Sequence, residues 1–170
     1  MPPGAASGDG DRSDPPQAVP GPVAGRGSVT GSAVPARVVF TPAANALLRR
    51  LREAFGPLIF HLSGGCCEGT APMCFRRSDF RVGPGDVLLG LVDGCPFYVG
   101  AAQFRYWAYC QVTVDVTVGG GDSFSLEAAD GVRFTAHARL FTDREAAALD
   151  AAGPPPTGPE AVQAAGVADR

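Results

Sequence analysis

The sequence predicts a single α+β domain, with one main N-terminal helix packed on a mainly antiparallel β-sheet core. Two observations predict this fold: a segment near the start has the apolar period of a helix, and several later segments have the patterns of strands. Every Phe, Tyr, Trp, Cys and His lies within residues 37–145, which are expected to form the domain. A range of this length is enough for one hydrophobic core and too short for two.

A short strand and then the main helix open the predicted domain. Residues 38–40 are apolar and suit a strand. Thr41 and Pro42 predict the helix start, because a hydroxyl caps free amides and proline fits the first helical position. Gly56 and Pro57 predict its end. The apolar positions between them follow the helical period and are Ala44, Leu47, Leu48, Leu51 and Phe55.

Strands are predicted for most of the remaining domain. In chain order they are residues 58–62, 86–92, 96–99, 111–118, 124–126 and 132–140. Asp93 and Gly94 predict a hairpin turn between the second and third of these. Residues 111–118 place valine at every second position, which is typical of a half-buried strand. The aromatic stretch 104–109 is expected to pack in the core because it is rich in apolar surface.

Both ends of the chain are predicted to lack stable structure. Residues 1–36 contain seven Gly and seven Pro and no aromatic residue. Such a segment cannot bury enough apolar surface to offset a backbone entropy of about 1–2 kcal/mol per residue. Residues 146–170 are expected to form a short helix and then a disordered tail rich in Pro and Ala.

Charge and hydropathy exclude several classes of partner. The net charge of -3 argues against a nucleic-acid-binding surface. No run approaches the ~18 apolar residues of a transmembrane helix, so no membrane partner is expected. The first residues lack the pattern of a secretory signal, which predicts a cytoplasmic protein. In a reducing compartment the five Cys are interpreted as thiols or metal ligands.

Residues 61–75 carry most of the side chains suited to chemistry. Cys66, Cys67 and Cys74 lie there together with His61. Thiolates and imidazoles are ligands for zinc and iron, and thiolates also hold iron–sulfur clusters. These residues therefore predict a metal site made by the three cysteines, with His61 as the next candidate. The spacing differs from that of zinc fingers and ferredoxins.

The spacing also predicts how such a site would close. Neighbouring side chains diverge along an extended chain, so Cys74 is expected to approach either Cys66 or Cys67. His61, Glu68 or Cys110 would complete the pocket. The default role of the other candidates is packing, and these are Cys95, Cys110 and His137.

Two other functions stay open on the sequence. Cys66 or Cys67 would be the reactive group of a thiol enzyme or redox protein, with His61 as its base. No Cys–His–Asn order, serine triad motif or phosphate-binding loop supports a particular enzyme class. The third alternative is a structural interaction module.

Several motifs resemble one bacterial family, domain-of-unknown-function family 779. They are FTPAA, GPLIFHLSGGCCEGTAPMC, DVLLG, PFYVGAAQFRYW and FSLEAADGVRF, and they span residues 40–141. Members of this family are often encoded beside aldehyde dehydrogenases. The resemblance therefore implies a non-catalytic accessory protein with an aldehyde dehydrogenase as its partner.

A more distant resemblance is to the A-type iron–sulfur carriers. Five features carry this resemblance. They are a helix beginning TPAA, a strand leading into Gly-Gly-Cys, an aromatic segment, a valine-rich strand and a G-x-x-F turn at residues 121–124. It implies the carrier fold, with Cys66 as the first cluster cysteine. The carriers' closing Cys-Gly-Cys pair has no counterpart after Phe124, so a cluster would need Cys67, Cys74 or His61 instead.

Overall fold

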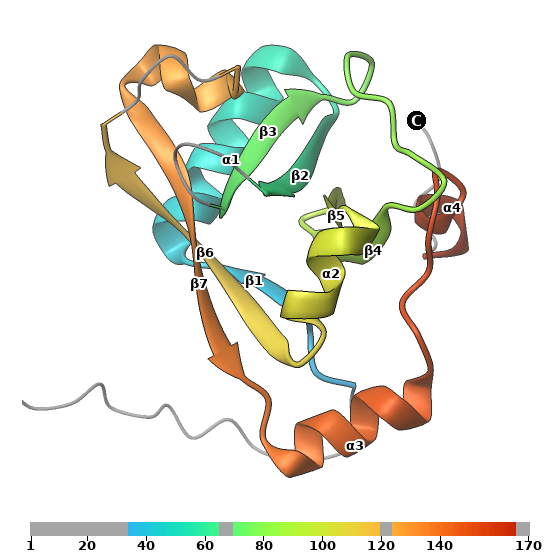
Figure 1. Cartoon of the computed structure of the whole chain (residues 1–170). Coiled ribbons are helices and arrows are strands. Elements are labelled where there is room, and N and C mark those ends of the chain that lie inside the picture. Colours follow the sequence, from blue (N-terminus) through green and yellow to red (C-terminus); the bar gives the residue numbers. More distant parts are fainter. Residues whose placement is uncertain (1–33, 65–69, 120–123, 166–170) are drawn as a thin grey trace, which may run out of the picture. The chain divides into compact units, whose positions relative to one another are not determined.

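A computed structural model of the whole chain describes residues 34–64, 70–119 and 124–165 (Figure 1). These residues belong to the unit formed by Ser32–Arg170. The strands are β1 Val38–Phe40, β2 Leu58–Gly64, β3 Thr70–Arg76, β4 Val87–Val92, β5 Cys95–Val99, β6 Cys110–Val118 and β7 Val132–Leu140. The helices are α1 Pro42–Phe55, α2 Ala101–Trp107, the 3-10 helix η1 Leu126–Asp130, α3 Asp143–Ala152 and α4 Ala161–Ala164.

The strands form two sheets, in the orders β1-β6-β7 and β3-β2-β5-β4. The β1–β6 and β2–β5 pairs are parallel, whereas the β2–β3, β4–β5 and β6–β7 pairs are antiparallel. The longest helix, α1, follows β1 and contacts β1, β6 and η1. The α+β class and the mainly antiparallel sheet core are therefore confirmed.

The start of α1 is held by one side chain. The Thr41 hydroxyl accepts a hydrogen bond from the Ala44 amide at 3.2 Å and donates one to Asp115 Oδ1 at 2.7 Å. The second bond ties the helix start to β6. Gly56 ends the helix with a φ of 79°, which a residue without Cβ adopts at little cost. The predicted helix bounds are confirmed.

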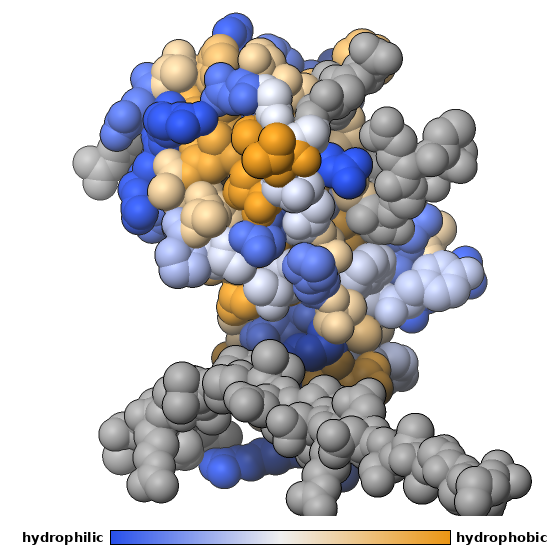
Figure 2. Space-filling view, turned by 90° about the vertical axis from the view of Figure 1, so that its left-hand side faces the viewer, coloured by the Kyte–Doolittle hydropathy of each residue, from blue (hydrophilic) through white to orange (hydrophobic). Residues whose placement is uncertain are grey.

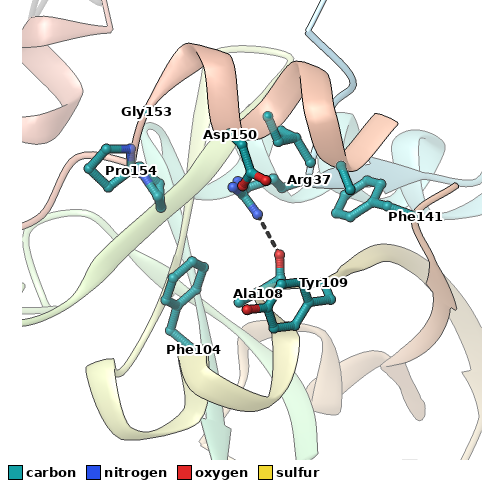
Figure 3. Close-up of a pocket in the computed structure, with 11 residues that line it drawn as sticks. Arg37, Phe104, Ala108, Tyr109, Phe141, Asp150, Gly153 and Pro154 are labelled. Carbon is teal, nitrogen blue, oxygen red and sulfur yellow. Dashed lines mark hydrogen bonds between the residues drawn. The ribbon is translucent and has the colours of Figure 1, made fainter. Parts of the chain in front are cut away.

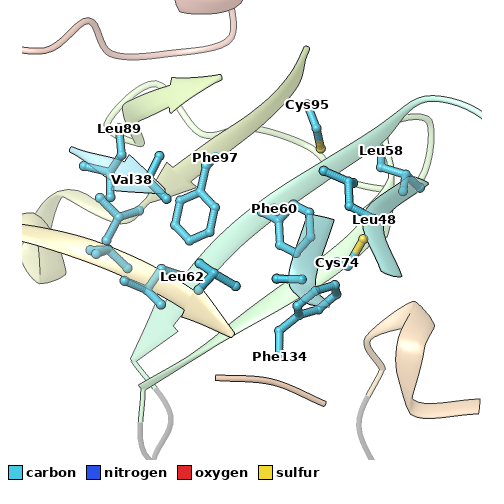
Figure 4. Packing of buried hydrophobic residues seen from close by; sticks show 14 of the residues in the cluster. Val38, Leu48, Leu58, Phe60, Leu62, Cys74, Leu89, Cys95, Phe97 and Phe134 are labelled. Atoms are coloured by element: carbon cyan, nitrogen blue, oxygen red, sulfur yellow. The ribbon is translucent and has the colours of Figure 1, made fainter. Parts of the chain in front are cut away.

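Four aromatic rings join the two sheets at the centre of the core, and Figure 4 shows three of them, Phe60, Phe97 and Phe134. Phe60 of β2 stacks on Phe97 of β5, with ring centroids 5.7 Å apart. Phe40 of β1 and Phe134 of β7 meet Phe60 edge to face, at 5.1 and 4.9 Å. Such edge-to-face pairs contribute about 0.5–1.5 kcal/mol beyond the burial of their area.

Three elements differ from the sequence prediction. Residues 70–76 form β3, which pairs with β2 from end to end, although no strand was predicted there. Residues 126–130 form the helix η1 where a strand was expected to begin at residue 124. The aromatic stretch 104–109 does not pack wholly in the core, because Tyr106 and Tyr109 are 76% and 71% exposed.

The tail expected to be disordered packs on the second sheet for residues 153–165, so that part of the prediction is wrong. Pro156 O accepts a hydrogen bond from the Leu88 amide, and the Gly158 amide donates to Asp86 O, both at 2.9 Å. The Tyr98 hydroxyl donates to Gly158 O at 3.1 Å. These bonds satisfy backbone groups at the edge of β4, so the proline-rich segment is held although it has little hydrophobic surface. The other predicted tail, up to residue 33, lies outside the described residues.

Within the residues that the structure describes, no helix is both long enough and apolar enough to cross a membrane.

We predict that Thr41→Ala lowers the free energy of unfolding by about 1–2 kcal/mol, because it removes the cap of α1 and the bond to Asp115. Thr41→Ser keeps the hydroxyl and is the matched control. Urea unfolding followed by circular dichroism measures both. Equal stability of Thr41→Ala and the wild type would contradict the role of this cap.

Candidate functional site

The predicted site surrounds the β2–β3 hairpin. β2 and β3 pair in register from Leu58 opposite Arg76 to Gly64 opposite Thr70. Residues 65–69 connect the two strands and lie outside the described residues. Cys66, Cys67 and Glu68 fall in this connection, so the predicted approach of Cys74 to one of the paired cysteines is untested.

Cys74 lies in the hydrophobic core. Its side chain is fully buried beside Leu48 and Phe134, and Cys95 lies nearby (Figure 4). Burial raises the pKa of the Cys74 thiol well above its usual value, and the neighbouring Cys95 and Glu127 add to this effect. Burial likewise raises the pKa of Cys95 to about 12. Both thiols therefore stay protonated at neutral pH, and both pack as small apolar groups.

His61 lies on the other face of the same sheet. Cys74 is opposite Phe60 and His61 is opposite Met73 in the β2–β3 register. Because successive side chains of a strand point to opposite faces, His61 and Cys74 do not face one another. Across the described ranges of the chain, no three His, Cys, Asp or Glu side chains are grouped to hold a metal ion.

His61 has an acidic neighbour that the sequence did not point to. Its Nε2 lies 3.5 Å from Asp86 Oδ1, and the two side chains are 14% and 19% exposed. The other Asp86 oxygen accepts a hydrogen bond from the Gly83 amide at 2.8 Å, which orients the carboxylate. The Phe80 ring covers the imidazole at a centroid distance of 5.1 Å. The outer face of the second sheet therefore carries a partly buried Asp86–His61 pair.

The remaining candidates lie in the first sheet. Cys110 begins β6 opposite Leu140 and is half-buried. His137 is opposite Thr113 in β7 and is exposed. The expected completion of a pocket by Cys110 depends on residues 65–69 and stays a prediction.

A buried polar chain connects Cys74 to Glu127, and sequence reasoning missed it. The Cys74 amide donates to Ser125 Oγ at 2.8 Å, and the Ser125 hydroxyl donates to the Glu127 carboxylate. The Phe134 amide donates to the other Glu127 oxygen at 3.3 Å. Glu127 is only 2% exposed. Burial raises its pKa, although the bonds from Ser125 and Phe134 partly offset the effect.

A cavity of about 320 Å³ lies between α2 and α3 (Figure 3). Arg37 enters it, donates from Nη1 to Ala108 O at 2.8 Å and lies 5.7 Å from the Phe104 ring centroid. Burial lowers the pKa of Arg37, and attraction to Asp150 opposes that shift. The guanidinium is thus engaged by the protein's own groups, which indicates a structural role in joining the two helices.

A family model described as "Domain of unknown function (DUF779)" matches residues 47–140. The chain belongs to this family. The match confirms the family resemblance carried by the sequence motifs. No curated protein matches the DUF779 chain.

The DUF779 chain also has a distant likeness to an A-type iron–sulfur carrier. The solved structure is the crystal structure of IscA with the [2Fe-2S] cluster, at 19% identity and a TM-score of 0.37. The alignment covers 59% of this chain and 83% of the IscA chain. A likeness at this TM-score says nothing about function. Any function must therefore be inferred from the residues described above.

We predict that Glu127→Gln changes the pH dependence of stability. The raised pKa means that the folded protein holds the Glu127 proton more tightly than the unfolded chain. The resulting stabilisation is complete below the unfolded pKa of about 4.3 and is lost as pH rises through the folded value. Relative to wild type, the free energy of unfolding of Glu127→Gln should therefore increase from about pH 4 to pH 7.

Urea unfolding at a series of pH values measures this difference. Glu53→Gln, at an exposed position of α1, is the control for losing a carboxylate. A constant difference between Glu127→Gln and wild type across this pH range would refute the raised pKa.

Proposed function

We propose that this DUF779 protein is a non-catalytic accessory protein that binds a metal ion or an iron–sulfur cluster through Cys66, Cys67 and His61. The observation that carries the proposal is the pairing of His61 with Asp86, because His61 lies on β2, the strand that leads in sequence to the two adjacent cysteines. Zinc, iron and an iron–sulfur cluster all accept thiolate and imidazole ligands.

The surroundings of His61 suit a metal ligand. A carboxylate against one ring nitrogen fixes the orientation of a metal-binding histidine and raises its basicity. Asp86 stands in that position relative to His61. β2 ends at Gly64, three residues after His61, and Cys66 follows two residues later in the sequence.

The described residues alone do not make a complete metal site, because Cys66 and Cys67 lie in the connection of residues 65–69. Cys74 was the third predicted ligand, but its thiol is buried, protonated and on the opposite face from His61. We therefore assign Cys74 to packing in this proposal. Adjacent side chains diverge, so Cys66 and Cys67 would contribute unequally to one ion. Fewer than four protein ligands would leave coordination positions for a second protein or for the cargo itself.

Metal and sulfide analysis of protein purified without oxygen tests this proposal. We expect a bound metal that is lost in Cys66→Ser or Cys67→Ser and retained in Cys74→Ala, the matched control. His61→Ala should lose it too, and Asp86→Asn should weaken binding about 10–100-fold because Asp86 orients the ligand. Metal retained by a variant lacking both Cys66 and Cys67 would overturn the proposal.

The second candidate function is thiol chemistry at Cys66 or Cys67. The same pair favours it, since an imidazole oriented by a carboxylate is the base of many nucleophilic sites. In that case the purified protein would be metal-free, and one of these thiols would react quickly with iodoacetamide at neutral pH. Mass spectrometry of the labelled protein would show slower labelling in His61→Ala. Cys74 and Cys95 should stay unlabelled, because both are buried and protonated.

We further propose that the partner is a cytoplasmic aldehyde dehydrogenase. The support is the resemblance of the sequence motifs to a family often encoded beside such enzymes. Co-expression with the aldehyde dehydrogenase encoded nearest to this chain should give a complex that persists through size-exclusion chromatography. Separate elution of the two proteins at micromolar concentration would argue against this partner.

A further inference from the structure

A cavity of about 420 Å³ lies on the outer face of the second sheet and is lined in part by Val162 of α4. Its wall includes two arginines, Arg77 and Arg81, and no acidic residue. Phe80, Val82 and Val162 are among the apolar residues that line it. The volume is within the range of about 300–1,000 Å³ that is typical of small-molecule sites.

We propose that this cavity binds a small organic anion, namely a carboxylate on an apolar body. Neither Arg77 nor Arg81 is in an ion pair within the described part of the chain. Both residues line the cavity, and Arg77 is half-buried whereas Arg81 is exposed. Two unpaired guanidinium groups attract a carboxylate, which each can bind through two parallel hydrogen bonds.

Ring contacts and backbone hydrogen bonds hold the apolar part of the cavity in place. The Phe80 ring stacks on Phe75 at a centroid distance of 5.0 Å and leans on His61. On the opposite side the chain is fixed by the Tyr98 hydroxyl, which donates to Gly158 O, and by the Gly158 amide, which donates to Asp86 O. Preformed walls of this kind reduce the ordering cost of binding.

Within the described residues, none of the neighbouring acids lies within ion-pair distance of Arg77 or Arg81. Asp86 is held by His61 and by the Gly83 amide. Asp79 accepts a hydrogen bond from the Ser78 hydroxyl at 2.7 Å. Glu160 acts on Tyr98 through its charge, but it is not part of the cavity wall. The wall therefore keeps a positive charge that a neutral ligand would leave uncompensated.

The ligand class follows if the ligand contacts both the arginines and the apolar residues of the wall. Inorganic phosphate would pair with the arginines and leave the apolar surface uncovered. A neutral aromatic molecule would cover that surface and leave both charges unpaired. An aromatic or aliphatic carboxylate pairs with the arginines and also covers the apolar surface. This inference uses neither Cys66 nor Cys67, so it is independent of the proposed metal site.

The test is a two-dimensional ¹H–¹⁵N NMR titration of the full chain with benzoate and, separately, with hexanoate. We expect saturable shifts of the Val82 and Tyr98 amides. Arg77→Gln and Arg81→Gln should each weaken binding by about tenfold, because each removes a charge-assisted hydrogen-bonded pair. Arg144→Gln, an exposed arginine of α3 outside the cavity, is the matched control and should bind as the wild type does.

Benzyl alcohol and inorganic phosphate separate the two parts of the wall. Both should bind at least about tenfold more weakly than benzoate if charge and apolar contact act together. Equal binding of benzyl alcohol would remove the role of the arginines, and equal binding of phosphate would remove that of the apolar wall. Arg81 is exposed, so we expect Arg81→Gln to keep the fold. Unchanged affinity in both Arg81→Gln and Arg77→Gln would overturn the proposal.

Discussion

The contact of Phe60 with three other rings holds the two sheets together, and the rest of the structure depends on it. Phe60 and Phe97 belong to the second sheet, whereas Phe40 and Phe134 belong to the first. Once Phe60 points inward, strand alternation places its neighbour His61 on the outer face. The same constraint turns Cys74, opposite Phe60, into the core. The inward orientation of Phe60 thus buries Cys74 in the core and leaves His61 on the outer face.

The two faces of the second sheet have different electrostatic properties. On the inner face Cys74 and Cys95 are buried, and their thiols stay protonated. On the outer face, Asp86 and His61 are partly open to solvent. On the face shown in Figure 2, hydrophobic residues gather in a patch that is bordered by hydrophilic residues. Of these four side chains, only the two on the outer face are open to solvent.

Local signals in the sequence predicted much of the fold. The cap at Thr41 and the end at Gly56 are short-range features, and both bounds of α1 agree with them. The turn at Asp93 and Gly94 has positive φ at both residues, 53° and 77°, which suits the tight hairpin predicted there. By contrast, apolar and polar residues do not clearly alternate in β3. This segment is a strand because it pairs with β2, and strand propensity alone does not reveal that partner.

The site was harder to predict because its contacts are long-range. The four candidate ligands were chosen for closeness in sequence, yet His61 and Cys74 are on opposite faces of one hairpin. Recognising β3 and its register would have separated them. Asp86 and Glu127 are brought to their partners only by the fold, and an isolated acidic residue in a sequence gives no signal of burial. Composition therefore singled out one region of the chain but not the pairing within it.

The proline-rich segment shows why composition alone misjudges a tail. β4 is the edge of its sheet, and an uncovered edge has unpaired backbone groups that favour aggregation. Pro156 accepts a bond from β4, and Thr157 forms a bridge to Val87. Proline lacks an amide donor, so this segment covers the edge without offering a complete new one. Residues 156–158 thus satisfy an edge strand, and the residues that follow them, Pro159 and Val162, line the cavity on the same sheet.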